Sequence, residues 1–294
     1  MPIASQNVAR WLRALEAEAT VDEASASSAR ERVRALGASA GLSEIAIASL
    51  ATAASELAHN HLRHARDGAI AVHLVERAGV AGVEVVAADA GAGIRDPARA
   101  MAGGASDKGG LGAGFSSIFR LCDEVDVDVR QSEGTCVWAR KFAAPSPRRP
   151  QVAVLSRPIS GEDTSGDDAT FVRRSDGSLL VAIADGLGHG VEARAASRAA
   201  MDEILSDPSR SLTAIVDAAH ARLAATRGAV MSVAILGAAR DVSVVNVGNT
   251  TTQIVAAQGS RRFGGQSWFL GQAARRGSAS VEQGSLGARE MLVL

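Results

Sequence analysis

The sequence predicts two α/β domains joined by a proline-rich segment. Its 294 residues are enough for two separate hydrophobic cores. Helix-like and strand-like hydrophobic patterns alternate along both halves of the chain, which is typical of mixed α/β folds. Residues 143–150 contain three prolines, which end the preceding strand pattern and mark a boundary. We therefore expect domains at residues 1–142 and 151–294, with residues 143–150 as the linker.

The first long helix is predicted over residues 43–64. Apolar side chains recur at helical spacing through this segment and give the helix one buried face. Glu56 and Asn60 lie four positions apart, so they share another face. Mg²⁺ binds oxygen ligands and takes only one or two of them from protein, which suits Asn60. Glu56 is then placed to orient or deprotonate an attacking hydroxyl group or water.

A glycine-containing turn follows the next predicted strand, which covers residues 83–88. The strand ends at Asp89, whose carboxylate suits the amino group of adenine. Gly91 and Gly93 follow it and allow the backbone to approach a flat base closely.

A second glycine-rich turn, Gly109-Gly-Leu-Gly-Ala-Gly114, precedes a predicted helix over residues 115–121. The free N–H groups and the positive dipole at the start of a helix favour a phosphate there. Lys108 lies just before this turn and is a further candidate phosphate ligand, the alternative being a solvent-facing lysine. Helix, Asp-Gly turn and glycine-rich turn, in that order, predict a nucleotide site.

These motifs resemble the ATPase domain shared by histidine kinases, gyrase, heat-shock chaperones and MutL, and most closely that of RsbT-type anti-sigma and switch kinases. The resemblance covers about residues 1–142, and no phospho-accepting histidine motif precedes it. It implies a two-layer α/β sandwich that binds ATP and Mg²⁺ and phosphorylates a serine or threonine of a STAS-type anti-anti-sigma or scaffold protein. The matching positions are Glu56 as general base, Asn60 on Mg²⁺, Asp89 on adenine, and Gly91, Gly93, Gly110, Gly112, Gly114 and Thr135 around the nucleotide.

Composition excludes several other classes of function. The net charge is −1, aromatic residues make up 3% of the chain, and tyrosine is absent, so we expect no nucleic-acid partner. Cys122 and Cys136 have no metal-binding or redox spacing. The N-terminus lacks a signal-peptide pattern, and no apolar run is long enough to span a membrane, so we expect a cytoplasmic protein. His59, His61 and His64 are interpreted as surface or cleft-edge histidines rather than a metal site.

The second half is predicted to begin with a strand over residues 152–155. Strand patterns at residues 169–172 and 179–184 follow, and a hairpin between them would bring Asp167 and Asp185 to one end of a sheet. Paired carboxylates of this kind can hold two divalent ions about 4 Å apart with a bridging nucleophilic water.

This half resembles the metal-dependent type 2C serine/threonine phosphatases, in the subgroup of SpoIIE and RsbX. The resemblance rests on Gly166-Asp167 and on Asp185-Gly-Leu-Gly-His-Gly190. It implies an α/β/β/α sandwich in which Asp167 and Asp185 bind Mn²⁺ or Mg²⁺ and Gly186 offers its carbonyl group. Predicted helices and strands that agree with this fold cover residues 191–205, 212–226, 231–236, 242–247 and 252–256.

One departure from that family concerns its later metal-binding aspartates. In the family, a strand like residues 290–294 leads into a Ser/Thr-Asp-Gly turn, whereas this sequence stops at Leu294. Three interpretations stay open: a truncated chain, a metal site with fewer ligands, or a domain that is no longer a phosphatase.

Kinase and phosphatase in one chain would form a self-contained partner-switching regulator. An alternative is a nucleotide-gated module that sequesters a partner and carries a non-catalytic docking domain. A third possibility keeps only the phosphatase, with the ATP site as its sensor.

Overall fold

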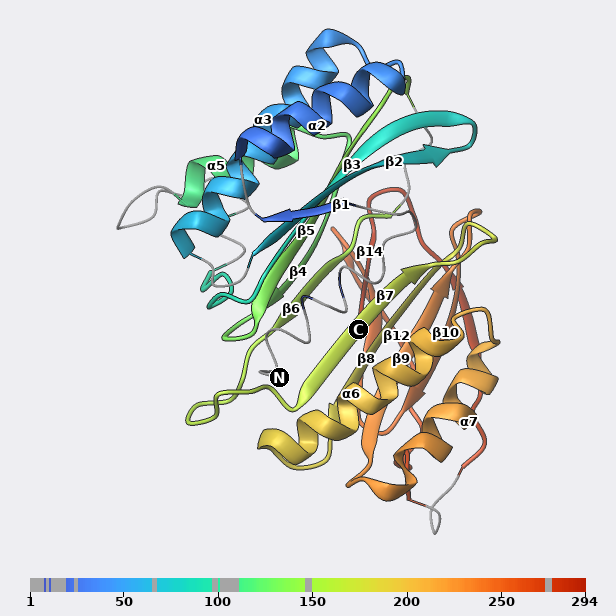
Figure 1. The fold of residues 1–294 in the computed structure, drawn as a ribbon. Coiled ribbons are helices and arrows are strands. Elements are labelled where there is room, and N and C mark those ends of the chain that lie inside the picture. Colours follow the sequence, from blue (N-terminus) through green and yellow to red (C-terminus); the bar gives the residue numbers. More distant parts are fainter. Residues whose placement is uncertain are drawn as a thin grey trace. The chain divides into compact units, whose positions relative to one another are not determined.

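The chain forms two compact units, Met1–Arg157 and Pro158–Leu294, in a computed structural model (Figure 1). The structure describes residues 8, 11, 20–23, 26–64, 68–96, 100, 111–145, 150–272 and 277–294. Within these residues, no helix has the length and apolar character needed to cross a membrane.

The first unit is a sheet with helices on one face, a two-layer α/β sandwich. Its helices are α2 (Ala26–Ser39), α3 (Glu44–His64) and α5 (Leu111–Leu121). Its strands are β1 (Thr20–Glu23), β2 (Ala69–Arg77), β3 (Val80–Asp89), β4 (Glu124–Arg130), β5 (Gly134–Phe142) and β6 (Ala153–Ser156). They are ordered β1-β2-β3-β5-β4-β6, and all neighbouring pairs are antiparallel except the parallel pair β4–β6.

The core of this unit lies between the sheet and the helices. α2 and α3 pack on each other, α3 contacts α5, β3 and β5, and Figure 1 shows all three helices on the same side of the sheet. Leu50 and Leu57 of α3 meet Val85 of β3 and Val137 of β5 in this layer. Residues 43–64 therefore form the predicted helix with its buried face, starting one residue later than expected.

The opposite face of the same sheet is buried but charged, which the strand patterns did not indicate. Glu84 of β3 and Arg140 of β5 form an ion pair, and Arg140 also pairs with Asp126 of β4 at 2.6 Å. All three side chains are almost fully buried. Trp11 covers part of this face and donates a hydrogen bond from Nε1 to Asp128 Oδ2 at 2.8 Å. Buried ions are tolerated here because they are paired.

The strand expected to open the second domain belongs to the first unit. β6 runs parallel to β4, from Val127↔Ala153 to Arg130↔Ser156, and the division between the units falls after Arg157. The proline-rich segment ends β5, as its composition indicated. A hydrophobic pattern alone does not specify which strand will be the pairing partner, so the boundary differs from the expected one.

The second unit contains two sheets and one described layer of helices. Strands β7 (Asp167–Arg173), β8 (Leu179–Gly186), β9 (Ala229–Leu236), β10 (Asp241–Val247) and β13 (Glu282–Ser285) form a sheet ordered β13-β10-β9-β8-β7. A smaller sheet has the order β12-β11-β14 and consists of β11 (Thr252–Ala256), β12 (Gly259–Phe263) and β14 (Met291–Val293).

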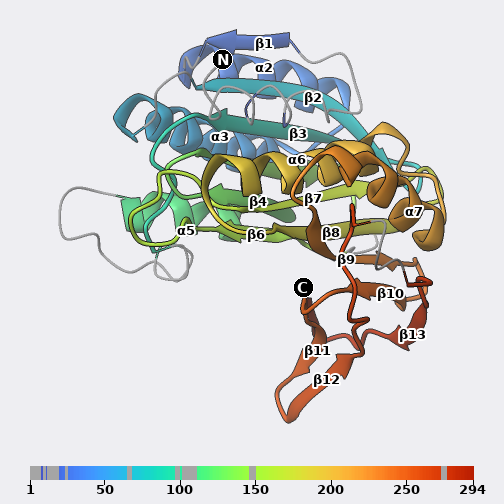
Figure 2. The same ribbon diagram turned by 90° about the horizontal axis from the view of Figure 1, so that it is seen from below.

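Helices α6 (Gly190–Ser206) and α7 (Leu212–Arg222), with the short helix η1 (Leu223–Ala225), pack on the larger sheet. Figures 1 and 2 show α6 next to α7; α6 contacts β7, β8 and β9, and α7 contacts β9 and β10. Met201 of α6 and Ile215 of α7 meet Leu180 of β8 and Val233 of β9 in a second core. Of the expected α/β/β/α order, the described residues thus form one helical layer and both sheets.

Candidate functional site

A small cavity in the first unit brings together three of the predicted nucleotide-site elements. Its volume is about 50 Å³. The apolar lining comes from both sides of the core, and the polar lining comes from the ends of β3 and β5 and from α3. The lining residues are Leu57, Asn60, His61, Ala87, Asp89, Gly93, Ile94, Phe115, Thr135 and Val137.

Asp89 is the acidic group of this cavity. It ends β3 and lies opposite Thr135 of β5 in the sheet register. Its Oδ1 accepts a hydrogen bond from the N–H of Gly91 at 2.8 Å, and its side chain is 15% exposed. Burial raises the pKa of Asp89 to about 6, although hydrogen bonds from the backbone of Gly91 and Thr135 oppose this rise. The carboxylate therefore remains ionised near pH 7 and can accept a hydrogen bond from a ligand.

Gly134 allows β5 to approach β3 at this point. Its φ is +124°, and a Cβ atom there would lie 2.0 Å from the carbonyl oxygen of Asp89. No side chain can occupy that position without moving the backbone. The glycine therefore fixes the end of the strand pair that carries Asp89 and Thr135.

The two predicted site residues on α3, Glu56 and Asn60, differ in their position relative to the cavity. Asn60 lines it, whereas Glu56, one turn earlier, is half-buried and is not among the lining residues. This placement is compatible with Asn60 near a nucleotide and Glu56 farther along the same helix face.

The second glycine-rich turn is only partly described. α5 begins at Leu111 rather than at the expected residue 115, so Gly112 and Gly114 lie in its first turn. Lys108 and Gly110 lie outside the described residues.

His61 is a cavity residue that the sequence analysis did not assign to the site. Its side chain is 5% exposed, whereas a surface or cleft-edge position was expected. Its Nε2 lies 3.8 Å from Asp89 Oδ2, and burial lowers its pKa to about 4. His59 is exposed, as expected. One signal was available in the sequence, because His61 falls four residues after Leu57, on the inward-facing side of α3.

The predicted carboxylate pair of the second unit is formed by the hairpin of β7 and β8. Asp167 and Asp185 lie directly opposite each other in the antiparallel register. The pKa of Asp185 is raised to about 6 by burial and by the neighbouring carboxylate of Asp167. Two carboxylates so close together favour either a shared proton or a bound cation.

Contacts from α6, made mainly by two arginine side chains, hold this hairpin end. Arg194 Nη1 donates a hydrogen bond to the carbonyl oxygen of Asp167 at 2.6 Å, and Arg198 pairs with the buried Asp168 at 3.1 Å. A Cβ atom at Gly186 would lie 1.9 Å from the carbonyl oxygen of Ala193, so the strand end and the helix are in close contact. In the described part of the chain, no group of three or more His, Cys, Asp or Glu side chains could hold a metal ion.

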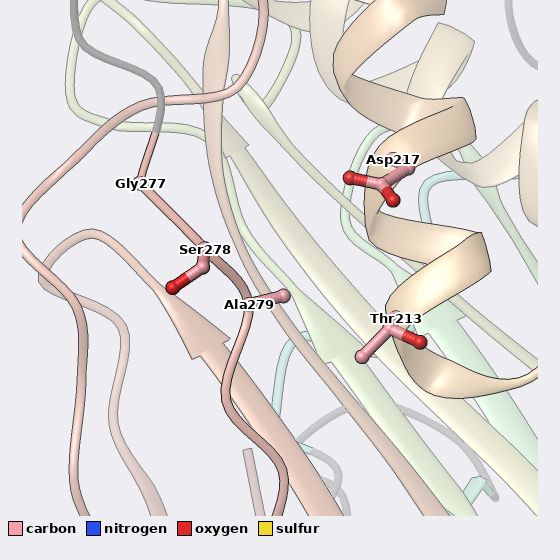
Figure 3. A pocket seen from close by; sticks show the side chains of 5 residues that line it. All are labelled: Thr213, Asp217, Gly277, Ser278 and Ala279. Carbon is pink, nitrogen blue, oxygen red and sulfur yellow. The ribbon is translucent and has the colours of Figure 1, made fainter.

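Another cavity, about 430 Å³, lies in the second unit. Figure 3 shows Thr213 and Asp217 on α7 facing the segment Gly277–Ala279. None of the predicted site residues lines it, and among its described lining residues Asp217 is the one carboxylate, beside small side chains.

Comparison with known proteins supports the interpretation of the first unit. Residues 17–141 match the family model described as a histidine kinase-like ATPase domain. The serine/threonine-protein kinase RsbT of Bacillus subtilis (strain 168) is 37% identical over 114 residues, which cover 39% of this chain and 86% of RsbT.

Several solved structures are similar to part of this chain. A bacterial stressosome structure is 27% identical with a TM-score of 0.43 and covers 46% of this chain and 70% of its own. RsbX in complex with magnesium has 22% identity, a TM-score of 0.40, and coverage of 45% and 65%. The PP2C domain of SiaA from Pseudomonas aeruginosa has 15% identity, a TM-score of 0.38, and coverage of 44% and 54%. All three TM-scores are below 0.5, so these likenesses are partial.

The match to RsbT is different in kind, because it spans nearly all of that kinase at more than 30% identity. Through its first unit, the chain belongs to the histidine kinase-like ATPase family that includes RsbT.

Proposed function

We propose that the first unit is an ATP-dependent serine/threonine protein kinase. The observation that carries this proposal is the single cavity that joins Asn60, Asp89 and Thr135 in a domain related to RsbT. These residues come from α3, β3 and β5, so their convergence depends on the fold and not on sequence proximity.

The polar acceptor and the apolar walls of the cavity suit an adenine base. Asp89 supplies a buried acceptor for an exocyclic amino group. Leu57, Ile94, Phe115 and Val137 supply apolar surfaces for a flat ring. In this proposal, Gly91, Gly93 and Thr135 border the base, and Gly110, Gly112, Gly114 and Lys108 border the phosphates.

Phosphoryl transfer requires positioning and charge neutralisation more than covalent chemistry from the protein. Asn60 would hold Mg²⁺, which neutralises charge on the phosphates. Glu56, one turn from Asn60, would accept the proton of the attacking hydroxyl group. The relation to RsbT favours a serine or threonine of a STAS-domain protein as the phosphate acceptor.

The second unit has its own candidate activity, which the Asp167–Asp185 pair favours. We propose that it binds Mn²⁺ or Mg²⁺ through these carboxylates and the carbonyl group of Gly186, and hydrolyses phosphoserine or phosphothreonine. In this reaction a water oxygen bonds to phosphorus, and the serine or threonine oxygen leaves with a proton.

Transfer of labelled phosphate from ATP to a STAS-domain protein tests the kinase proposal. The wild-type protein should label the partner, and Glu56→Gln should retain ATP binding but lower the transfer rate at least about 100-fold. Asn60→Ala should abolish binding of Mg-ATP measured by calorimetry. His59→Ala is the matched control, because His59 is the exposed neighbour of Asn60 on the same helix.

The result also separates the alternatives. A stable complex between this protein and the partner, with ATP bound but no phosphate transferred, would replace the kinase proposal with a nucleotide-gated binding module. Unchanged affinity for Mg-ATP in Asn60→Ala would contradict the role of Asn60. Release of phosphate from a phosphorylated partner that changes with ATP, without any transfer, would favour the sensor interpretation.

A further inference from the structure

His61 lies in the wall of the nucleotide cavity, one position after Asn60 on α3. A histidine that is 5% exposed is a costly choice for a position that an aliphatic side chain could fill, unless its polar atoms find partners. The surroundings of its two ring nitrogens therefore indicate what it could bind.

Among the residues that the structure describes, neither ring nitrogen has a full hydrogen-bond partner. Nδ1 is buried without one, and it faces Gly68, where a Cβ atom would lie 2.7 Å from it. Nε2 is 3.8 Å from Asp89 Oδ2, which is too far for a hydrogen bond. His61 and Asp89 both line the cavity, so a ligand bound there meets both side chains.

The chemistry of the two side chains makes them a donor–acceptor pair. An imidazole ring carries at least one N–H in either of its protonation states, and a carboxylate only accepts hydrogen bonds. The carboxylate 3.8 Å away favours that hydrogen on Nε2. The wall then offers a donor beside an acceptor. The edge of adenine offers the matching order, with an amino donor next to the acceptor N1, whereas guanine and hypoxanthine present the reverse order.

We propose that His61 is a base-specificity residue, which donates a hydrogen bond from Nε2 to ring nitrogen N1 of adenine while Asp89 accepts one from the amino group. This rests on the proposed nucleotide-binding function and extends it, because it assigns a second side chain to base recognition. The pair selects ATP over nucleotides with a 6-oxo purine.

Binding of ATP and of 1-deaza-ATP, which lacks N1, tests this assignment in calorimetry. The wild-type protein should bind 1-deaza-ATP about three- to tenfold more weakly than ATP. His61→Leu should bind both nucleotides with equal affinity, since the donor is gone.

His61→Phe is a second apolar variant in case His61→Leu does not fold, and circular dichroism checks folding. His61→Gln keeps an N–H donor and should restore part of the preference. 7-deaza-ATP is the control nucleotide and should bind each protein as ATP does.

The outcomes separate this proposal from the one on which it rests. An equal loss for 1-deaza-ATP in wild type and His61→Leu would overturn the role of His61 while leaving ATP binding intact. If 7-deaza-ATP, instead of 1-deaza-ATP, binds more weakly than ATP and this difference depends on His61, the assignment to N1 is overturned. If the wild-type protein binds no ATP, the nucleotide-site function itself fails.

Discussion

The nucleotide cavity and the Asp167–Asp185 pair differ in how the chain builds them. The cavity collects side chains from α3, β3, β5 and α5, which are separated by up to about half of the unit's length. The carboxylate pair comes from one hairpin, with α6 packed behind it. A site made from many elements depends on the whole domain. A site made from one hairpin depends mainly on the register of two adjacent strands. The first site is supported by its cavity and by the relation of its domain to RsbT. The second is supported by the register of the two strands that carry Asp167 and Asp185.

The largest effects are expected at the two glycines where the backbone approaches most closely. Gly134→Ala would place a Cβ atom 2.0 Å from the carbonyl of Asp89, and Gly186→Ala would place one 1.9 Å from the carbonyl of Ala193. Each should lower the free energy of unfolding of its own unit by about 3 kcal/mol or more. Gly79→Ala is the control, with φ +77° and no atom within 4 Å of the added Cβ, and should cost only about 1 kcal/mol.

Urea unfolding followed by tryptophan fluorescence measures this comparison. Trp268 is the one tryptophan of the sequence in the second unit, and Trp11 and Trp138 are in the first, so variants that keep one of them report on a single unit. If Gly134→Ala lowers the free energy of unfolding no more than Gly79→Ala does, the end of the β3–β5 pair can rearrange freely.

The carboxylate pair should be the only one of the two sites that responds to Asp185→Asn. We expect at least a tenfold loss of Mn²⁺ affinity, because half of the carboxylate charge is removed, and no change in ATP affinity. Asp176→Asn, in the exposed turn of the same hairpin, is the matched control. Calorimetric titration with Mn²⁺ measures the effect, and equal affinity in wild type and Asp185→Asn would remove the metal site from the proposal.

The raised pKa of Asp89 predicts opposite effects on binding and on stability. Nucleotide affinity should fall up to about tenfold per pH unit below pH 6, because the ionised carboxylate accepts the hydrogen bond. Stability changes the other way: a carboxyl group with a folded-state pKa above its unfolded value stabilises the fold at low pH, and this contribution is lost as pH rises from about 4 through about 6.

Asp89→Asn separates the two effects. At pH 7 it should weaken ATP binding yet raise the free energy of unfolding by up to about 3 kcal/mol, since the buried charge is removed. Calorimetry and urea unfolding at pH 5 and pH 7 measure both quantities. A variant that is less stable than wild type at pH 7 would contradict the sign.

The smallest effect is expected at His189, although it directly follows the Asp185 turn. Its Nδ1 lies 2.6 Å from Glu162 Oε1, but the side chain is 70% exposed, so solvent screens the ion pair. His189→Gln should change stability by less than about 0.5 kcal/mol. A larger loss in urea unfolding would mean that this ion pair, and not α6, holds the turn in place.

The order of the elements could be predicted, but several pairings could not. The helices α3, α6 and α7 begin within one residue of their predicted starts. Their hydrophobic periodicity is strong and local. β2 and β4 were not predicted, because β4 alternates valines with acidic residues that turn out to be buried by pairing with arginines. Such pairs depend on contacts between distant strands.

In the candidate sites, too, residues in local motifs could be predicted, whereas contacts between distant segments could not. Asp89, Asn60 and Thr135 were assigned from motifs and meet in one cavity, and Asp167 faces Asp185 as the predicted hairpin required. His61 was missed because its surroundings come from Gly68 and from β3, and neither is near it in a helical pattern.

The parallel pairing of β6 with β4 shortens the tether between the two units. Residues 153–156 are hydrogen-bonded to β4 as strand β6, so only ten residues, 157–166, connect β6 to β7. A force applied at Pro158 in the direction of β6 would load its hydrogen bonds in shear, all at once rather than one after another. The last of them joins the N–H of Gln131 to the carbonyl of Ser156, and the next residue, Ser132, bonds to Ala92 beside the nucleotide cavity. The end of β6 and the segment next to the cavity are thus held by the N–H groups of two consecutive residues, Gln131 and Ser132.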